Sequence, residues 1–452
     1  MKIEVLQKNL LNSVKFFFKL KKFSELEFSL LGYFYLCPFA PTKGNSRLFF
    51  FFNKIESLKI YIYATINDLI RLLKSGGYST ITPINFKNYK TIIVNWGYLK
   101  DFNNNGEFYD KHLNVSSKNC LDVMWYIIYL DNVLPKKISS NIVIVHEKKQ
   151  LSLVLYKNIF INFFKNKKKL KFLNQEFSHY STLANYIYHD FGKYINEVKK
   201  IIMPYEGQPY QNAIFKKTSE KGKQIETVGY IHSFPIGLPS NLAKRPGHPK
   251  KLIANSLSQK YSLVTHLGWK KNEIKIFPSA RFKKKVQLSM KNKIFLPITI
   301  FDHKKIINSF EELIEYKKTD FSNFEIRNHP SCISSKKHIK LIELLKKTIA
   351  KKIYKKKNKN NFSVFIGPTG SIIEALERNL EVFHICEKPV LESYSKKIWK
   401  YLNTIKIKDN LFKYKKIEKN KLLIFNSNSK IYLTLDEPRS SPRRSQDQNR
   451  IL

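Results

Sequence analysis

The stretch of residues 325–386 constrains the fold more than any other part of the sequence, because strand-like and helix-like runs alternate in it at short intervals. In the longer helical run, residues 336–353, apolar residues recur every three or four positions, which predicts one apolar helix face. These residues are Ile339, Ile342, Leu345 and Ile349. Residues 362–366 then predict a strand that leads into a Gly-rich turn, a second helix and a further strand. The alternation predicts an α/β fold with a parallel sheet and crossover helices.

Two polar turns follow strands in this stretch. The first contains His329 and Pro330, and Pro330 ends strand pairing because it has no backbone N–H. The second contains Thr369, Gly370 and Ser371 and precedes a helix. Ligands of open α/β sheets bind outside the carboxyl ends of strands, and free N–H groups at a helix start bind anions. The two turns therefore predict a site for an anionic ligand such as a nucleotide.

Ser371 and Glu374 fit a second interpretation as well. A Ser followed three residues later by Glu is the pattern of a capping box, in which the two side chains bond backbone N–H groups at the helix start. Ser371 is compatible with both roles, and for Glu374 capping and ligand binding remain alternatives.

The chain length predicts two domains. A single core rarely extends to 452 residues, and the 43% hydrophobic and 14% aromatic content is that of a folded protein. A Lys-rich segment near residues 275–290 has no clear periodicity and marks the boundary. We expect an N-terminal domain at residues 1–280, a C-terminal domain at 281–436, and a disordered Arg-, Ser- and Gln-rich tail at 437–452.

The N-terminal part shows the same alternation of strands and helices. The predicted strands are residues 59–65, 90–96, 141–145, 199–204, 226–231 and 262–267. The predicted helices are residues 67–74, the aromatic run 121–130, much of 150–200, and a helix from about residue 211. Residues 234–251 hold four prolines and predict a long irregular loop, a kind of segment that often lies over a cleft.

The formal net charge of +46 has two interpretations. A basic surface would face nucleic acid, anionic lipid or a phosphorylated substrate. Alternatively, the lysines reflect compositional drift, which their even spread along the chain favours. We therefore expect phosphate-bearing ligands and no nucleic-acid partner.

Cysteine usage and hydropathy bear on the compartment. The four cysteines are far apart and form no CxxC pair, which argues against structural zinc and a disulfide framework. No run reaches the ~20 apolar residues that span a bilayer. We expect a soluble cytoplasmic protein, and the charge is compatible with a peripheral position at the inner face of a membrane.

Three short motifs, taken in order, give the chain a family resemblance. They are Glu206-Gly207 after a predicted strand, the His329-Pro330 turn, and the turn from Thr369 to Ser371. With the contexts NWGYLKDFNNNGEFYD and MPYEGQPYQNAIF, the chain resembles GT-B-type glycosyltransferases of bacterial surface and capsular polysaccharide synthesis, including sialyltransferase-like and Kdo-transferase-like members. The likeness covers most of residues 90–390. It implies two Rossmann-like domains with a central cleft between them.

The resemblance implies a role for each motif. Glu206 would be the base that removes the acceptor proton, and Gly207 would let the acceptor approach the backbone. His329, beside Pro330, would donate to the departing nucleotide phosphate, with Thr369, Gly370 and Ser371 around the same anion. Glu374 would bind the ribose. Arg281, near the domain boundary, would reach the donor phosphates, and the alternative is an arginine exposed on the surface without a role. The family has two acidic residues before this Gly, whereas the first position here is Tyr205, which puts the base assignment in doubt.

Other residues are candidates for lining the cleft. They are His232, which ends a predicted strand and would bind the donor phosphate or the acceptor sugar, and Asn95, Trp96 and Gly97, which end another strand on the acceptor side. No DxD motif stands in a strand-loop position, so we expect metal-independent transfer without a cofactor. For Glu206 the alternative is a carboxylate at a helix start, and for His329 and His232 it is a hydrogen-bonded loop residue. The remaining histidines, His112 among them, have no partner pattern.

The predicted function is transfer of a sugar from a nucleotide donor, CMP-linked by the resemblance, to a surface polysaccharide or lipid-linked glycan. A similar His-Pro turn occurs in CDP-glycerol-type polymerases, so transfer of a polyol phosphate is one alternative. A basic nucleic-acid-binding protein and a non-catalytic scaffold are the others.

Overall fold

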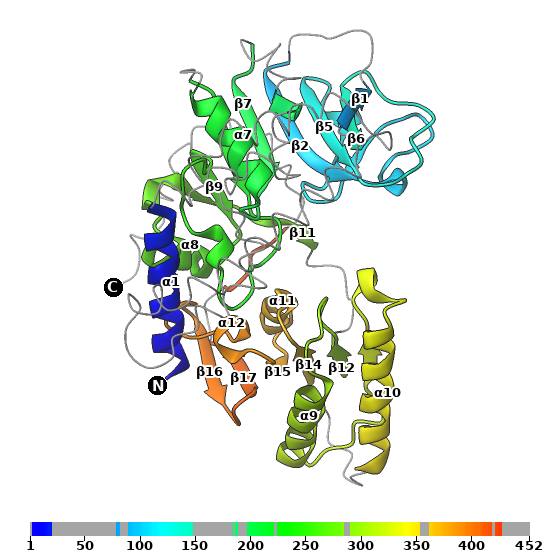
Figure 1. The fold of residues 1–452 in the computed structure, drawn as a ribbon, viewed down its shortest axis with the longest axis vertical. Helices are drawn as coiled ribbons and strands as arrows, with labels where there is room; N and C mark the ends of the chain where they lie inside the picture. The colour runs from blue at the N-terminus through cyan, green and yellow to red at the C-terminus, as the bar shows by residue number, and fades with distance from the viewer. Residues whose placement is uncertain are drawn as a thin grey trace, which may run out of the picture.

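The computed structural model describes residues 2–19, 78–81, 89–147, 183, 186–188, 197–220, 224–283, 290–352, 361–417 and 421–426. They form two α/β halves, each built on a mainly parallel sheet (Figure 1). We call residues up to 283 the N-terminal half and residues 290–417 the C-terminal half. The predicted α/β class with parallel sheets is confirmed.

The sheet of the N-terminal half has eight strands among the described residues, in the order β1-β6-β5-β2-β7-β8-β9-β10. All neighbours are parallel except β1, which is antiparallel to β6. The strands are β1 (Tyr78–Ile81), β2 (Thr91–Gly97), β5 (Val123–Tyr129), β6 (Ile142–Glu147), β7 (Lys200–Pro204), β8 (Glu226–Tyr230), β9 (Lys251–Ala254) and β10 (Ile274–Ile276). From β2 the chain builds outward through β5 and β6, then continues from β7 on the other side of β2. The carboxyl ends of β2 and β7 therefore lie where the strand order reverses, the usual place for a ligand in such sheets.

β5 explains why this sheet lies at the centre of its half. All its residues are buried, and alternate side chains join different core clusters, with Met124 and Tyr126 in one and Trp125 and Ile127 in the other. The predicted helix at residues 121–130 is therefore wrong. A strand that is buried on both faces is apolar throughout, so its sequence lacks the alternation of polar and apolar residues that distinguishes a strand from a helix. Strands of parallel sheets commonly have such sequences.

The strand predicted at residues 262–267 is also wrong, because these residues belong to α8 (Leu257–His266) and its C-terminal end. Ser256 caps this helix by accepting a hydrogen bond from the Gln259 N–H, which fixes a helix start upstream of the β-branched residues. The strands predicted at 90–96, 141–145, 199–204 and 226–231 correspond to β2, β6, β7 and β8. Helix α7 (Pro209–Glu220) follows β7, close to the predicted start. The elements predicted at 59–65 and 67–74, and nearly all of 150–200, lie outside the described residues.

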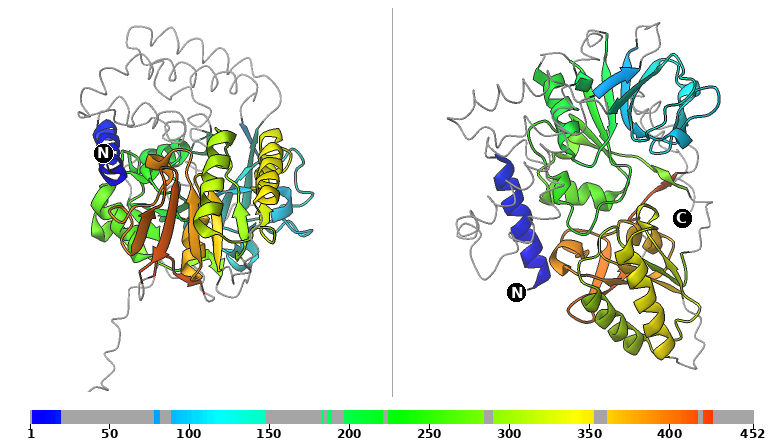
Figure 2. Two further views of the ribbon diagram at one scale, coloured as in Figure 1. Left: turned by 90° about the horizontal axis from the view of Figure 1, so that it is seen from below. Right: turned by 45° about the vertical axis from the view of Figure 1, so that its right-hand side comes forward.

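The sheet of the C-terminal half has six described strands in the order β13-β12-β14-β15-β17-β16, the last two added antiparallel. The strands are β12 (Lys293–Phe295), β13 (Glu325–Arg327), β14 (Phe362–Ile366), β15 (Glu381–Ile385), β16 (Leu402–Lys406) and β17 (Leu411–Lys416). The helices are α9 (His303–Lys317), α10 (Lys336–Lys351), α11 (Ser371–Glu377) and the short α12 (Pro389–Glu392). Figure 2 shows these helices against the sheet. The alternation predicted for residues 325–386 is confirmed.

Two details of that prediction change. The buried face of α10 consists of His338, Leu341, Leu345 and Thr348, while Ile339 is exposed. The capping box is wrong, because the N-cap of α11 is Gly370 and Glu374 instead binds Arg378 one turn later.

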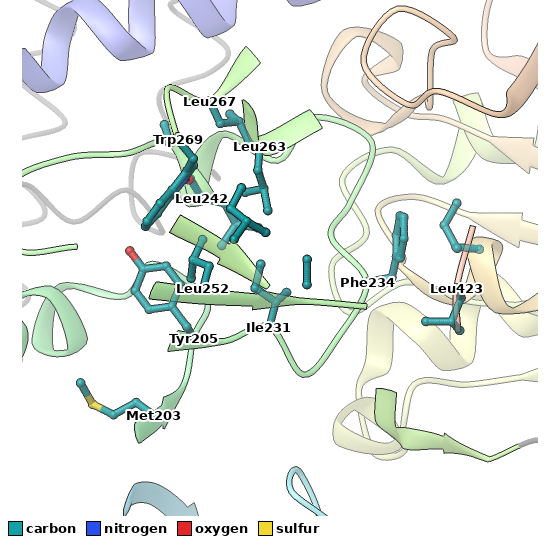
Figure 3. Packing of buried hydrophobic residues seen from close by; sticks show 14 of the residues in the cluster. Met203, Tyr205, Ile231, Phe234, Leu242, Leu252, Leu263, Leu267, Trp269 and Leu423 are labelled. Carbon is teal, nitrogen blue, oxygen red and sulfur yellow. The ribbon is translucent and has the colours of Figure 1, made fainter. Parts of the chain in front are cut away.

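The two halves share one core. Helix α1 (Ile3–Lys19) lies along both, beside α8 and α12, and the Gln7 amide donates hydrogen bonds to the carbonyls of Val390 and Ser393 (Figure 1). The largest apolar cluster runs from around Tyr205 and Trp269 through Phe234 to Leu423 (Figure 3).

The C-terminal end of the described chain returns to the N-terminal half. Strand β18 (Phe425–Asn426) pairs in parallel with β11 (Ser279–Lys283), and the Ile424 N–H donates to the Asn255 carbonyl. Residues 421–426 thus pack outside the C-terminal sheet, although they lie in the predicted C-terminal domain. The predicted disordered tail at 437–452 lies outside the described residues. No helix among the described residues is long and apolar enough to cross a membrane.

Candidate functional site

Three neighbouring strands of the N-terminal sheet bring polar and aromatic side chains together at their carboxyl ends. Trp96 stands at the end of β2, Glu206 follows β7 and His232 follows β8. The Trp96 ring contacts His112, Tyr210 and His232 edge-on, with ring centroids 5.8, 6.1 and 6.2 Å away. These residues occupy the point where the strand order reverses. We call Trp96, Glu206, His232, His112 and Asn95 the sheet-edge cluster.

Glu206 is held from several sides. Its Oε1 accepts a hydrogen bond from His232 Nε2 at 3.2 Å, and its Oε2 accepts one from the Gln208 amide at 3.0 Å. The Gln211 amide oxygen accepts from the backbone N–H groups of Glu206 and Gln208, so the start of α7 fixes this loop. The Glu206 side chain remains 37% exposed, against 6% for His232. The carboxylate therefore lies at the surface of the cluster, with His232 behind it.

Burial and hydrogen bonding act in opposite directions on Glu206. Burial, the largest effect, raises the pKa of the carboxyl group, but the hydrogen bond and charge of His232 together with the Gln208 amide hold the pKa below its usual value. A carboxylate that is ionised, oriented and accessible can accept a proton from a bound hydroxyl group. The alternative role at a helix start has no support, because the side chain turns to His232 and Gln208.

His112 enters the cluster from the turn between β3 (Tyr109–Asp110) and β4 (Val115–Ser116), a short antiparallel pair in the connection from β2 to β5. Its Nδ1 donates to the Asn95 side-chain oxygen at 3.1 Å, and the Asn95 amide nitrogen donates to Asp110 at 2.5 Å. Asp110 is fully buried and also accepts from the backbone N–H groups of His112 and Leu113. Burial raises the pKa of Asp110 to about 6, although these hydrogen bonds favour the ionised form. Asn95 is thus a buried link between Asp110 and His112, and does not line the surface of the cluster.

Sequence reasoning missed His112 and Asp110. Both lie at the end of the stretch DFNNNGEFYDKH, which its Asn and Gly content marks only as a turn. The nearest signal was the likeness of this stretch to surface-carbohydrate biosynthesis proteins.

At two positions, 97 and 207, glycine is required for structural reasons that differ from the predicted roles. A Cβ on Gly97 would lie 2.5 Å from Ile127 Cγ2 and 3.0 Å from the Phe108 ring, so Gly97 packs against the core. Gly207 has a positive φ of 72°, and a Cβ there would lie 2.0 Å from the Asn241 carbonyl oxygen. The close approach that requires glycine at 207 is thus made by Asn241 of the same chain.

The two predicted turns of the C-terminal half follow β13 and β14. The His329 N–H donates to the Asn328 side-chain oxygen, and the His329 carbonyl accepts from the Cys332 N–H, which closes the turn around the exposed Pro330. The His329 ring is partly exposed, and burial together with the charges of His338 and Arg281 lowers its pKa. These effects favour the neutral form of the ring.

The second turn is packed against the N-terminal half. Thr369 Oγ1 accepts from the Ser371 N–H at 3.2 Å, and the Thr369 carbonyl accepts from the Tyr394 hydroxyl at 3.0 Å. A Cβ on Gly370 would lie 2.1 Å from the Phe234 carbonyl oxygen. Gly370 is thus required by the contact between the halves. Thr369, Gly370 and Ser371 are all partly exposed.

The loop after β8 connects the two groups of predicted residues. His232 belongs to the sheet-edge cluster, and Phe234, two residues on, touches Gly370. Two residues of chain span at most about 7 Å. The backbone of His232, whose side chain bonds Glu206, therefore lies close to the turn at 369–371 on the other half.

Arg281 lies between the same groups. It is exposed on β11, its guanidinium lies 5.6 Å from the centre of the Phe282 ring, and its positive charge lowers the pKa of both His112 and His329. Glu374 is less available than predicted, because its carboxylate binds the Arg378 guanidinium at 2.8 Å.

His384, Cys386 and Glu392 form a buried group whose ligand-type atoms lie within 4.8 Å of one another. Hydrogen bonds already occupy this group. His384 Nε2 donates to the Gly367 carbonyl, Nδ1 accepts from the Tyr414 hydroxyl, and each Glu392 oxygen accepts a backbone N–H. A metal ion would have to break these bonds, so the arrangement fits a hydrogen-bonded support for the turn at Gly367 better than a metal site.

Comparison with known proteins gives limited information. No known protein-family model matches the chain. The chain is 27% identical over 259 residues to a lysine–tRNA ligase of Buchnera aphidicola subsp. Cinara cedri, a match that covers 54% of this chain. The chain covers 44% of that protein, which is less than half of its length. This similarity is too low and too partial to show a family.

Proposed function

We propose that this protein is a glycosyltransferase of GT-B architecture, with a Rossmann-like N-terminal half that binds the acceptor and a Rossmann-like C-terminal half that binds a nucleotide-sugar donor, CMP-linked by the resemblance. The observation that carries the proposal is the position of the Glu206–His232 pair. It lies at the strand-order reversal of one sheet and within a short span of chain from the polar turn of the other. Ligands of open α/β sheets bind at such reversals.

Each half contributes a different part of the reaction. Glu206 accepts the proton of the acceptor hydroxyl, whose oxygen bonds to the anomeric carbon of the donor sugar. The bond from that carbon to the nucleotide phosphate breaks, and the phosphate leaves with the electron pair. His329, Arg281 and the hydroxyl and N–H groups of the turn at 369–371 stabilise this charge. The acceptor is a glycan or a lipid-linked glycan of surface polysaccharide synthesis, reached from the cytoplasmic face of the membrane.

The proposal is tested by nucleotide binding to the full chain. CMP, CDP, UDP and their sugars are compared by thermal shift, and we expect CMP compounds to raise Tm. His329→Ala should weaken CMP binding about tenfold or more, because it removes a donor to a charged phosphate. His266→Ala is the matched control, since it also removes a partly exposed imidazole, one bonded to the Lys397 carbonyl, but lies at the end of α8. Absence of a shift with every nucleotide would refute the proposal.

The donor panel also separates the enzymatic alternative. Release of CMP accompanies sugar transfer, whereas a CDP-polyol donor would give transfer of the polyol phosphate.

The unusual net charge and the partial similarity to a tRNA ligase favour RNA binding as the competing hypothesis. It predicts affinity for RNA that falls steeply with salt, without discrimination among free nucleotides.

A further inference from the structure

His112 presents a ring nitrogen whose hydrogen-bonding state can be assigned. The Trp96 N–H donates to the Asn95 side-chain oxygen at 2.8 Å, which fixes the orientation of that amide. His112 Nδ1 lies 3.1 Å from the same oxygen and must therefore carry the proton. In a neutral ring Nε2 is then an acceptor, and no described residue donates to it. The ring is 14% exposed.

The surroundings keep this ring neutral. Burial is the largest effect and, with the charges of His232, Lys111 and Arg281, it lowers the pKa of His112 to about 3, although Glu206 acts in the opposite direction. Asp110, the other carboxylate nearby, is 3.9 Å from Nδ1. At neutral pH Nε2 can therefore accept a hydrogen bond but cannot donate one to a phosphate oxygen.

A second ring nitrogen without a partner lies beside it. His232 Nε2 donates to Glu206, and its buried Nδ1 has no partner among the described residues. The rings of His112 and His232 meet edge to face with their centroids 4.4 Å apart. The cluster thus places two ring nitrogens without a partner among the described residues, His112 Nε2 and His232 Nδ1, near the Glu206 carboxylate. Buried polar groups in folded proteins are normally paired.

We propose that His112 binds a hydroxyl group of the carbohydrate acceptor, which donates a hydrogen bond to Nε2 beside the Glu206 carboxylate. This inference rests on the proposed function and names the ligand of its N-terminal half as a polyhydroxylated acceptor, with the nucleotide phosphate on the other half. His112 takes no proton in the reaction. It is a positioning residue that orients the acceptor, while Glu206 removes the proton of the reacting hydroxyl.

Two substitutions of His112 test the roles of its two ring nitrogens separately. His112→Asn keeps a short amide able to donate to Asn95 but removes the acceptor at the Nε2 position. His112→Gln places an amide oxygen near that position. With an acceptor substrate, we expect His112→Asn to raise KM for the acceptor about tenfold, as the loss of one hydrogen bond would. His112→Gln should recover part of the loss, and CMP affinity should stay unchanged in both variants.

A direct measurement does not depend on turnover. Full-length protein labelled with ¹⁵N in histidine is titrated with glucose, galactose, glucosamine and glycerol at high millimolar concentration, and separately with inorganic phosphate and CMP. We expect the Nε2 resonance of His112 to show an unprotonated nitrogen at neutral pH and to move with at least one of the hydroxyl compounds. Phosphate and CMP should leave it in place.

Several results would overturn the assignment. These are a His112 ring that titrates near its ordinary pKa, an Nε2 resonance that responds to phosphate and to none of the hydroxyl compounds, and an acceptor KM that His112→Asn leaves unchanged. The wild-type spectra keep the test valid if a variant fails to fold. Failure of the proposed function appears differently, as an absence of nucleotide binding while the response of His112 to hydroxyl compounds persists.

Discussion

Glu206 keeps a negative charge in a crowded position because His232 offsets the effect of burial. The hydrogen bond between them therefore sets the pH at which the carboxylate can accept a proton. Tyr205, at the position where the glycosyltransferases that the chain resembles have an acidic residue, is fully buried and donates its hydroxyl hydrogen bond to Asn212. Glu206 is thus a single carboxylate, supported by His232.

His232→Phe should shift the acid limb of the pH–activity profile. Without the hydrogen bond and charge of His232, burial is the dominant effect, so the pKa of Glu206 rises and the ionised form is lost at a higher pH. The acid limb of kcat/KM for the acceptor should therefore move to higher pH, with a lower plateau.

Gln208→Ala is the matched control for this prediction. It removes the other side-chain donor to Glu206, which is the lesser effect, so the acid limb should move in the same direction by a smaller amount. An acid limb that stays in place in His232→Phe would show that another group sets it.

At the scale of elements, sequence patterns predicted best where one face of an element is polar. The unit from β13 to β15 was predicted because its helices are amphipathic and its turns are rich in Gly and Pro. The helix predicted at β5 is wrong because both faces of that strand are buried. The strand predicted within α8 is wrong because the β-branched residues there belong to a helix that Ser256 caps upstream. The local sequence shows the periodicity of apolar residues, but tertiary packing decides whether such a run forms a helix or a strand.

The candidate site was predictable to the extent that it lies at strand ends. Trp96, Glu206 and His232 each follow a strand that the sequence indicated, and parallel strands bring such ends together. Asp110 ends the two-residue strand β3 and His112 lies in the turn before β4, elements too short for a local pattern to place them against β2. The core contact of Gly97 likewise depends on tertiary packing. The bond of Glu374 to Arg378 joins residues four apart in a predicted helix, so the sequence does indicate it.

Gly370→Ala tests the contact between the 369–371 turn and the loop after β8. The added Cβ would lie 2.1 Å from the Phe234 carbonyl oxygen, and a backbone oxygen cannot rotate away as a flexible side chain does. The substitution should lower the free energy of unfolding by about 1–3 kcal/mol, the usual cost of overpacking. Urea denaturation measures the change.

Ser371→Ala serves as the control in that experiment, because it alters the neighbouring residue without adding an atom and removes a hydroxyl that is not needed to cap α11. We expect its free energy of unfolding to stay close to that of the wild type. Equal stability of Gly370→Ala and the wild type would mean that the two segments are not in contact in solution.

At the scale of the whole molecule, one short segment of the C-terminal half, which contains Tyr394 and Trp399, is hydrogen-bonded to the loop after β8. The Tyr394 hydroxyl lies 2.8 Å from the Pro235 carbonyl oxygen and 3.0 Å from that of Thr369, and Trp399 Nε1 donates to the Gly237 carbonyl at 2.7 Å. Both side chains are buried. The loop that carries His232 is thereby held against the turn of the other half, so these contacts also set the distance between the two parts of the candidate site.

Removing both of these hydrogen-bond donors should allow the two halves to unfold separately. Tyr394→Phe and Trp399→Phe each remove a buried donor, and each should lower the free energy of unfolding by roughly 1–3 kcal/mol because carbonyl groups are left unpaired. Since both contact the same loop, their effects should not be additive. We expect the wild type to unfold in a single transition because the halves share one core, and this transition should broaden or separate into two in the double variant, as when domains unfold independently. The transition is followed in urea by fluorescence and by far-UV circular dichroism.

Tyr414→Phe distinguishes uncoupling from general destabilisation. Its hydroxyl donates to His384 and accepts from the Tyr394 N–H, so it belongs to the same buried network but makes both bonds within the C-terminal half. This variant should lose a similar amount of stability and keep the cooperativity of the wild type, because no bond between the halves is removed. If the double variant and Tyr414→Phe gave equally sharp, coincident transitions with both probes, the shared core around Phe234 and not these two hydrogen bonds would couple the halves.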